Sequence, residues 1–289
     1  MKYSLKTLWK NLKILSKYNL EDIEYNLEKK IYDNIPYEND VYKDDMLLIL
    51  DYWETINLLT NQPKSFCRFG DGEIDIIDGK SIPFQEYDDK LADILGRILK
   101  ENNNDLYVGI NYNYFHSTTK LNEFNRRFYI KNSNKLRDRF LKYCNRDRTY
   151  IAAGFNQLYT THDDFDFDSF YRMVKLLFKD RDLVIFAGES VFKDIQYDVF
   201  EMARSKKIFF EKSKNAFDDY DIILKKCLYE DCDKTLLFIL GPCSKALVYE
   251  LTKQGRIAWD IGHLAKDYDW YMKKRKKNTQ SITEFYQQD

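Results

Sequence analysis

The chain has 289 residues, enough for one large α/β domain or two small ones. Its 46 basic and 47 acidic side chains leave a net charge of −1, which gives no overall attraction to nucleic acid and argues against such a partner. No apolar run approaches the ~20 residues of a membrane helix, and lysines interrupt the apolar positions near the amino terminus. We therefore expect a cytoplasmic protein without a signal peptide or a membrane span.

The five cysteines agree with a reducing compartment. They are odd in number, scattered along the chain and mostly set among apolar residues, which is typical of reduced, buried thiols. Four residues separate Cys227 from Cys232, and no second pair repeats this spacing, which argues against a zinc site.

The amino-terminal segment predicts an amphipathic helix over residues 3–18. Its apolar residues recur at helical spacing, and its lysines line another face without any acidic residue. Such a helix either packs on the domain with a solvated lysine face or lies on an anionic membrane, which would place the protein at the inner face of that membrane. Residues 21–45 are acidic and are expected either to fold back on this helix or to form a homodimer contact.

Strands and helices are predicted to alternate from residue 46 onward. The predicted strands are residues 65–67, 106–110, 149–153, 183–187, 207–210, 235–240 and 256–259. The predicted helices are residues 46–59, 88–100, 118–144 with a break near 132–134, 169–178, one around 198–200, 215–229 and 243–253. Short apolar strands with few hairpin signals predict a doubly wound, mostly parallel sheet.

The stretch Arg68-Phe69-Gly70-Asp71-Gly72-Glu73 follows the first of these core strands. Gly70 and Gly72 are expected to supply backbone angles closed to other residues, so that the chain turns sharply and brings Asp71 and Glu73 together. Two carboxylates one residue apart suit Mg²⁺ or Mn²⁺, with open positions left for substrate phosphates, and Arg68 would contact those phosphates. The alternative is an ordinary solvated loop, followed by a short connection over residues 74–83.

Other loops follow the carboxyl ends of later strands, where an open α/β sheet binds its ligands. The loop with Tyr112 and Tyr114 alternates amides and aromatic rings. Because rings stack on sugar faces and amides bond hydroxyl groups, this loop either lines a groove for a sugar acceptor or is simply packed in the protein. Gly241 introduces a helix whose first N–H groups form an anion site, with Ser244 and Lys245 as further contacts in its first turn.

Three more polar residues are candidates at this edge. Asn215 either caps the helix after it, with Asp218 completing a capping box, or contacts a nucleotide, as the family resemblance described below implies. Asp260 and His263 follow the last strand, where either could complete the metal shell with Asp71 and Glu73 or accept the proton of an acceptor hydroxyl. In the alternative, Asp260 caps the next turn and His263 is a packing residue.

Two of these stretches together resemble the DUF1792 glycosyltransferases, the group with the GT-D fold. The first is the hexapeptide from Arg68 to Glu73, and the second runs from Thr235 through Gly241 and Lys245 to residues 260–263 and 268–270. The resemblance covers residues 63–270 and departs from the family at residues 190–193, where a more glycine-rich loop with an arginine is expected. It implies a Rossmann-like fold whose Asp-X-Glu motif binds the metal that holds a nucleotide-sugar diphosphate.

The chain is therefore predicted to be a metal-dependent glycosyltransferase. It would move a hexose from a UDP-hexose, such as UDP-glucose, to a lipid-linked or protein-linked glycan in surface polysaccharide or glycoprotein synthesis. The alternative is a metal-nucleotide binding or phosphohydrolase domain without sugar transfer. The expected organisation is a helical extension (residues 1–62), the Rossmann-like glycosyltransferase domain (63–272) and a basic tail (273–289). No Gly-X-Gly-X-X-Gly fingerprint is present, which argues against an NAD enzyme.

Overall fold

The computed structural model describes residues 5–17, 19–34 and 46–287. These residues form an eight-stranded sheet in the order β1-β4-β3-β2-β8-β7-β5-β6, and every pair of neighbouring strands is parallel. The strands are β1 (Leu48–Ile49), β2 (Ser65–Phe69), β3 (Leu106–Ile110), β4 (Thr149–Ala152), β5 (Asp182–Gly188), β6 (Ser205–Glu211), β7 (Thr235–Ile239) and β8 (Ala258–Asp260). The predicted parallel α/β architecture is confirmed, and the seven predicted strands match to within two residues at each end.

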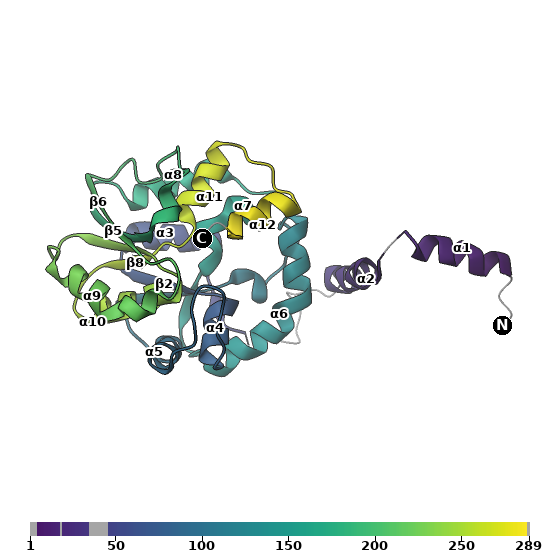
Figure 1. Cartoon of the computed structure of the whole chain (residues 1–289), viewed down its shortest axis with the longest axis horizontal. Coiled ribbons are helices and arrows are strands. Elements are labelled where there is room, and N and C mark those ends of the chain that lie inside the picture. The colour runs from purple at the N-terminus through teal and green to yellow at the C-terminus, as the bar shows by residue number, and fades with distance from the viewer. Residues whose placement is uncertain (1–4, 18, 35–45, 288–289) are drawn as a thin grey trace.

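Helices cover both faces of this sheet (Figure 1). They are α1 (Leu5–Leu15), α2 (Leu20–Asn34), α3 (Tyr52–Asn61), α4 (Asp71–Ile77), α5 (Asp89–Lys100), α6 (Glu123–Tyr143), α7 (Leu158–Thr161), α8 (Phe167–Leu177), α9 (Tyr220–Tyr229), α10 (Pro242–Lys253), α11 (Leu264–Met272) and α12 (Thr279–Gln287). Helices α4, α5, α6, α9 and α10 contribute to the hydrophobic core on one face, and α3, α7, α8, α11 and α12 contribute to the core on the other.

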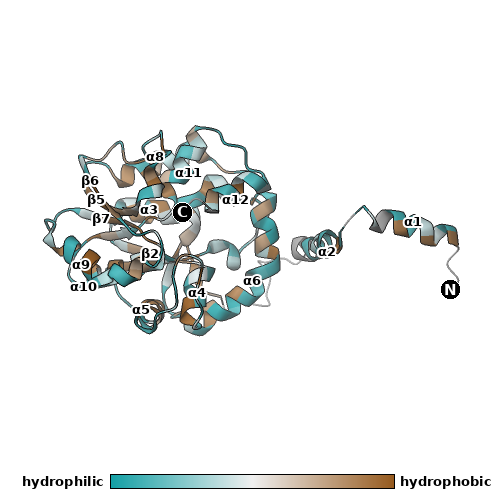
Figure 2. Ribbon diagram, in the orientation of Figure 1, coloured by the Kyte–Doolittle hydropathy of each residue, from teal (hydrophilic) through white to brown (hydrophobic). Residues whose placement is uncertain are grey.

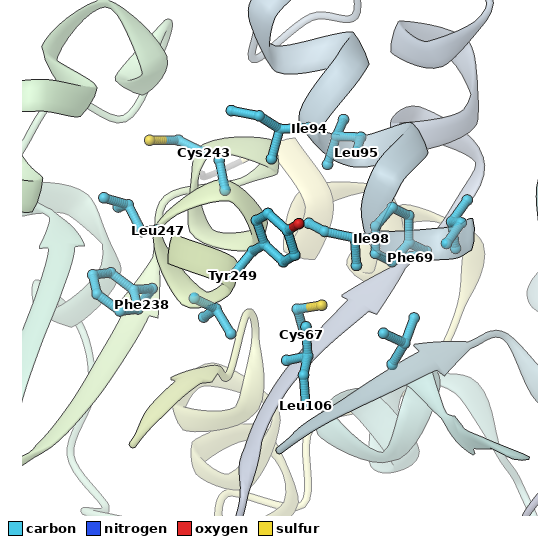
Figure 3. Packing of buried hydrophobic residues seen from close by; sticks show 14 of the residues in the cluster. Cys67, Phe69, Ile94, Leu95, Ile98, Leu106, Phe238, Cys243, Leu247 and Tyr249 are labelled. Carbon is cyan, nitrogen blue, oxygen red and sulfur yellow. The ribbon is translucent and has the colours of Figure 1, made fainter. Parts of the chain in front are cut away.

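Each central strand supplies side chains to both cores, because successive residues of a strand point to opposite faces. In β5, Val184 and Phe186 belong to one core, whereas Leu183, Ile185 and Ala187 belong to the other. This is why the strand reads as a continuous apolar run. Figure 3 shows the first core, where Cys67 and Phe69 of β2 face side chains of α5 and α10.

The prediction of one helix over residues 46–59 is wrong at its beginning. Leu48 and Ile49 pair with Thr149 and Tyr150 as the outer strand β1. Helix α3 begins only at Tyr52, because Asp51 caps it: the Asp51 side chain accepts from the Glu54 N–H at 2.8 Å, and the Glu54 side chain accepts from the Asp51 N–H at 2.8 Å. This Asp-X-X-Glu capping box is visible in the sequence and marks the true start.

Two further predictions are wrong. Helix α6 runs without a break through residues 132–134, where Asn132 donates to the Phe128 carbonyl oxygen at 2.8 Å and so stays compatible with the helix. Residues 198–200 form a turn, because the Asp198 side chain accepts from the Phe200 N–H at 2.8 Å. The bond from the Asp198 side chain to the backbone two residues on competes with a helix at this position.

The amino-terminal helices lie to one side of the body (Figure 1). Helix α2 packs on α6, where Asp22 pairs with Arg127 at 2.9 Å and the Arg127 guanidinium lies 4.3 Å from the centre of the buried Tyr25 ring. Helix α1 projects beyond α2, so the acidic helix does not fold back on the basic one. The predicted amino-terminal helix (residues 3–18) and the acidic segment (21–45) also include residues 3–4, 18 and 35–45, which lie outside the described residues.

The carboxyl-terminal stretch is more than a basic tail. Residues 279–287 form α12, in which Ile282 and Phe285 are fully buried. All five cysteines are unpaired, and of these only Cys232 is exposed. Within the described ranges, no helix is both long and apolar enough to cross a membrane.

Candidate active site

A pocket of about 350 Å³ opens at the carboxyl edge of the sheet. Residues that end or follow successive strands line it: Phe69 and Gly70 for β2, Asn111 for β3, Ala153 for β4, Gly188 for β5, Gly241 for β7, and Asp260 and Gly262 for β8. β2 and β8 are neighbours in the sheet, and the chain leaves β2 into α4 and α5 on one face but leaves β8 into α11 on the other face. The pocket therefore lies at the switch point where open α/β sheets bind ligands.

Arg68 and Phe69 end β2, and residues 70–73 form the beginning of helix α4, so the predictions of a glycine-driven loop and of a plain connection after it are wrong. Gly70 is the N-cap residue of α4 with a φ of −121°, and Gly72 is not among the residues with positive φ. The Gly70 N–H donates to Glu73 Oε2 at 2.8 Å, which bends the glutamate back over the helix start. At Gly72 a Cβ atom would lie 3.3 Å from Ile82 Cδ1, so this glycine packs closely against the Ile82 side chain.

Four charged side chains form a buried chain of ion pairs beside the motif. Lys245 Nζ lies 2.9 Å from Glu73 Oε1 and 3.1 Å from Asp260 Oδ2. Arg68 Nη2 lies 3.0 Å from Asp260 Oδ1, and its Nε donates to the Asp260 carbonyl oxygen at 2.9 Å. Two positive and two negative groups balance each other, as buried charges require.

The electrostatics keep this network ionised. Burial alone would raise the pKa of Asp260, but the Arg68 and Lys245 charges overcome it and lower that pKa. Burial would likewise lower the pKa of Lys245, but Asp260 and Glu73 reverse this effect and raise it. Lys245 also donates to the Gly241 carbonyl oxygen at 3.2 Å, so its three N–H groups face three acceptors. Lys245 therefore holds the site together in this conformation.

Asp71 is the carboxylate of the motif that opens on the pocket. Its side chain is exposed there, and no lysine, arginine or histidine of the described residues forms an ion pair with it. Loss of hydration to the surrounding protein, followed by the Glu73 and Asp75 charges, raises its pKa, although N–H groups of its own turn oppose this. A cation bound at this carboxylate would relieve the unfavourable charge.

The residues here fit a metal ion that takes only one or two ligands from the protein and the others from substrate phosphates and water. The described part of the chain contains no group of three or more His, Cys, Asp or Glu side chains that could hold a metal ion. Both oxygens of Glu73 already accept bonds from the protein, which leaves Asp71 as the open ligand. Mg²⁺ is often bound by one or two carboxylates with substrate phosphates and water filling the other positions, and Asp71 suits that arrangement.

Gly262 makes the close packing around Arg68 possible. It has a φ of +44°, and a Cβ atom there would lie 2.0 Å from Arg68 Nη2 and 2.7 Å from Asn156 Nδ2. The Gly262→Ala substitution should therefore displace Arg68 from Asp260 and lower the melting temperature strongly. The matched control is Gly255→Ala, where φ is +74° but nothing lies within 4 Å, so only backbone strain of roughly 1–2 kcal/mol is expected. Equal melting temperatures for the two variants would contradict this role of Gly262.

His263 and the carboxyl-terminal helix form a further wall of the pocket. His263 lines the pocket directly before α11, and its ring centre lies 5.4 Å from that of Phe285 and 5.8 Å from that of Tyr286. Tyr286 also lines the pocket. The sequence did not indicate this role for Tyr286, because no motif or pattern links a residue of the last helix to the sheet edge.

Four predicted binding residues do not line the pocket. Ser244 is fully buried, and its Oγ accepts from the Leu240 N–H at 2.9 Å, so it shapes the turn before α10. Tyr114 is buried in the core, whereas Tyr112 is half-buried and stacks on His116 with ring centres 3.9 Å apart.

Asn215 is the fourth. It stands at the N-cap position of the short helix that begins at Ala216, as predicted, but the predicted capping box with Asp218 is not formed. It has a left-handed backbone with a φ of +52° and makes no side-chain cap bond. Instead its Oδ1 accepts from the Glu86 N–H at 2.8 Å, and its own N–H donates to the Phe84 carbonyl oxygen at 2.8 Å. Asn215 thereby fixes the loop that carries Phe84, which itself lines the pocket.

The structure thus brings most of the predicted site together and adds residues that the sequence did not single out. The predicted residues that line the pocket are Arg68, Gly70, Asp71, Glu73, Gly241, Lys245, Asp260 and His263. The added ones include Ile82, Phe84, Val191, Ser213 and Tyr286. Ser213 lies so close to the end of β5 that a Cβ atom on Gly188 would approach its Oγ to 2.1 Å.

Known proteins share this sequence pattern. The family model for the glycosyltransferase GT-D fold matches residues 66–288. The chain is 28% identical over 233 residues to the "Probable glycosyl transferase Gly" of Streptococcus gordonii, in an alignment that covers 79% of this chain and 34% of that protein. The glycosyltransferase GlyD of Streptococcus pneumoniae serotype 4 is 27% identical and is covered over 28% of its length. The chain therefore spans about a third of the length of these curated relatives.

Solved structures share the fold. One, described as the domain of unknown function 1792 with a distinct glycosyltransferase fold, is 31% identical with a TM-score of 0.74 and covers 80% of this chain and 83% of its own. Another, described as a new DUF1792 glycosyltransferase from Streptococcus sanguinis, is 26% identical with a TM-score of 0.74, covering 81% and 87%. Because the family model spans well over half of the sequence, the chain belongs to the glycosyltransferase family of the GT-D fold.

Proposed function

We propose that this chain transfers a hexose from a nucleotide-diphosphate sugar, a UDP-hexose such as UDP-glucose, to a hydroxyl group of a glycan. The observation that carries the proposal is the pocket at the switch point of the sheet. It is lined both by the open carboxylate of Asp71 and by Gly241 at the beginning of α10. The lining also contains the apolar side chains of Ile82, Phe84 and Val191. A nucleotide sugar needs both kinds of surface, polar groups for the diphosphate and apolar ones for the base.

The beginning of α10 is the site proposed for the diphosphate. Gly241 has a φ of +54° and a ψ of −137°, a conformation open mainly to glycine, and Pro242 occupies the first helical turn. The N–H groups and dipole of a helix start attract anions. Arg68 adds positive charge at the pocket wall, although its guanidinium is held by Asp260.

Asp71, with Glu73 beside it, would hold Mn²⁺ or Mg²⁺ in this proposal. The metal would supply Lewis-acid and electrostatic stabilisation of the charge that develops on the departing diphosphate. Glu73 would become a ligand only by giving up a bond to Lys245 or to the Gly70 N–H, so its first role is to position the helix start.

His263 is a better candidate than Asp260 for the base that takes the proton from the hydroxyl group of the glycan acceptor. In the transfer step the acceptor oxygen forms a bond to the anomeric carbon, the bond from that carbon to the diphosphate breaks with its electrons leaving on the diphosphate, and the hydroxyl proton passes to a base. Asp260 is 1% exposed with a lowered pKa and both oxygens bound to Arg68 and Lys245, so it acts as a positioning residue. His263 faces the pocket and can reach an acceptor there.

The direct test measures UDP release from a panel of UDP-hexoses with Mn²⁺, with Mg²⁺ and with chelator, each with and without lipid-linked and protein-linked glycan acceptors. Transfer that requires both metal and acceptor supports the proposal. Release of UDP that no acceptor accelerates would instead favour a metal-dependent phosphohydrolase. Full turnover in the presence of chelator would contradict the proposed metal dependence.

Tyr286 is expected to contribute to substrate binding from α12. The Tyr286→Ala substitution removes a ring from the pocket wall but leaves the buried anchors Ile282 and Phe285 in place. We expect KM for the donor or the acceptor to rise about tenfold, which corresponds to ~1.4 kcal/mol of lost ring contact, with little change in melting temperature. Tyr286→Phe, which keeps the ring, is the matched control. A lowered melting temperature with unchanged KM would show that Tyr286 is only structural.

A further inference from the structure

The helix α1 presents an uncovered apolar face to solvent. Leu5, Leu8, Trp9 and Leu12 are between 49% and 82% exposed, and Figure 1 shows the helix projecting from the body beyond α2. Figure 2 shows hydrophobic and hydrophilic positions side by side along it. Large apolar side chains gathered on one exposed helix face indicate a surface that binds something.

The helix α2 presents a second uncovered face, on the side away from the body. Tyr25 and Asp22 face α6, whereas Leu20 and Leu27, on the opposite side of the helix, are exposed. Ile23, Asn26, Leu27 and Lys30 line an open groove of about 210 Å³ on this outer side. One chain therefore carries two bare apolar helix faces.

The two helices carry opposite charge. Helix α1 contains Lys6, Lys10 and Lys13 and no acidic residue, a charge of +3. Helix α2 contains two lysines and five acidic residues, so its charge is 2 − 5 = −3; the acidic residues are Glu21, Asp22, Glu24, Glu28 and Asp33. The two helices are thus opposite in net charge, and both carry exposed apolar residues.

The lysines of α1 and the glutamates of α2 each form a row along one side of the helix, and the positions of these two rows relative to the apolar faces match. At roughly 100° per residue, the lysines of α1 lie to one side of its apolar face, and Glu21, Glu24 and Glu28 lie to the same rotational side of the apolar face of α2. When two such helices face each other antiparallel, both rows lie on the same side of the contact, where lysine meets glutamate. A parallel arrangement would separate the rows.

We infer that α1 packs antiparallel on α2 of a second copy of this chain, and that the two copies exchange these helices in a two-fold dimer. The helix lengths agree, because α1 of 11 residues covers roughly 16 Å and α2 of 15 residues roughly 22 Å. In the structure α1 does not lie against its own α2 (Figure 1), so its apolar face stays available to the other copy. Such exchange of an element between copies is a common route to dimers.

An anionic membrane would explain only half of these observations. It would attract the lysines of α1, but it would repel the glutamates of α2 and leave the face of Leu20 and Leu27 bare. The second copy accounts for both faces and both charges.

A charge-swap experiment on the full chain tests the inference by light scattering after size-exclusion chromatography, at about 10 μM protein and low salt. The natural chain should be a dimer. A first variant (Lys6→Glu, Lys10→Glu, Lys13→Glu) and a second (Glu21→Lys, Glu24→Lys, Glu28→Lys) should each be monomeric, with dissociation constants raised at least tenfold. Their mixture should form a heterodimer, because each α1 then meets an α2 of opposite charge.

A control variant carries the same change of net charge as the first variant, but on the body: the exposed Lys100, Lys179 and Lys225 are each replaced by Glu. It should remain a dimer. A natural chain that stays monomeric, whether α1 folds back on its own α2 or binds vesicles of anionic lipid instead, would overturn the inference. So would a mixture of the two variants that stays monomeric while each variant keeps the natural melting temperature.

Discussion

Replacement of Asp71 by Asn is expected to reduce sugar transfer at least 100-fold while leaving the fold as stable as before or slightly more stable. The loss is of the size seen when one electrostatic group that stabilises a transition state is removed. The stability follows from the sign of the pKa shift. The pKa of Asp71 is raised in the folded protein by partial loss of hydration and by the Glu73 and Asp75 charges, so its ionised form at neutral pH opposes folding. Removal of that charge does not weaken the fold.

Two measurements check this expectation together. The rate of UDP release should fall while the melting temperature is unchanged or higher, and the Mn²⁺ concentration for half-maximal rate should rise in any residual activity. Asp75→Asn is a useful control, because Asp75 lies on the same helix but pairs with Arg139 at 2.7 Å and does not line the pocket. If Asp71→Asn kept full activity, Asp71 would have no part in catalysis.

Replacement of Lys245 by Met is expected to have the largest effect on stability. Methionine fills a similar volume but leaves Glu73 and Asp260 buried with one cation fewer between them. Removal of one partner from a buried ion pair costs about 3–5 kcal/mol, which corresponds to a melting temperature lower by about 10 °C in a chain of this size. Activity should fall as well, because both the start of α4 and Arg68 lose a support.

The control for this variant is Arg97→Met, which breaks an exposed ion pair with Asp93 at 3.0 Å. An exposed pair contributes at most about 1 kcal/mol, so its melting temperature should change little. A Lys245→Met protein as stable as the natural chain would show that the network is not required for the fold.

The same network predicts a dependence on pH. The folded-state pKa of Asp260 is lowered, so its contribution to stability is present above the ordinary carboxyl pKa and is lost as the pH falls through the lowered value. The difference in unfolding free energy between the natural chain and Asp260→Asn should therefore be largest at neutral pH and shrink in acid. Urea unfolding of both proteins at a series of pH values measures it.

The parallel architecture could be predicted from the sequence because short apolar strands alternate with helices of clear periodicity. The strand β5 with Val184 and Phe186 is an example, since its burial on both faces gives an unbroken apolar run. The site could be placed at the correct edge by the same logic, because ligand loops follow the carboxyl ends of parallel strands. Arg68, Asp71, Lys245 and Asp260 indeed line one pocket.

The sequence could not reveal how these residues are paired. Glu73 was expected beside Asp71 as an open ligand, yet its position three residues after Gly70 lets it cap its own helix and meet Lys245. Tyr286 could not be found because its place depends on how the last helix returns to the sheet. Tyr114 looked like a binding residue, but it lies in the core beside Tyr129 and Phe140. Local spacing does not record such long-range contacts.

The centre of the sheet joins opposite ends of the domain, since β2 pairs with β8 at Phe66 and Trp259. A ribosome delivers the chain from its amino terminus, so β2, β3 and β4 emerge well before the strand that lies beside β2. Arg68 has no Asp260 to hold it during most of synthesis. The pocket therefore does not exist on the nascent chain until β8 has been made, and a translation product that ends before Asp260 should be unable to bind a sugar donor.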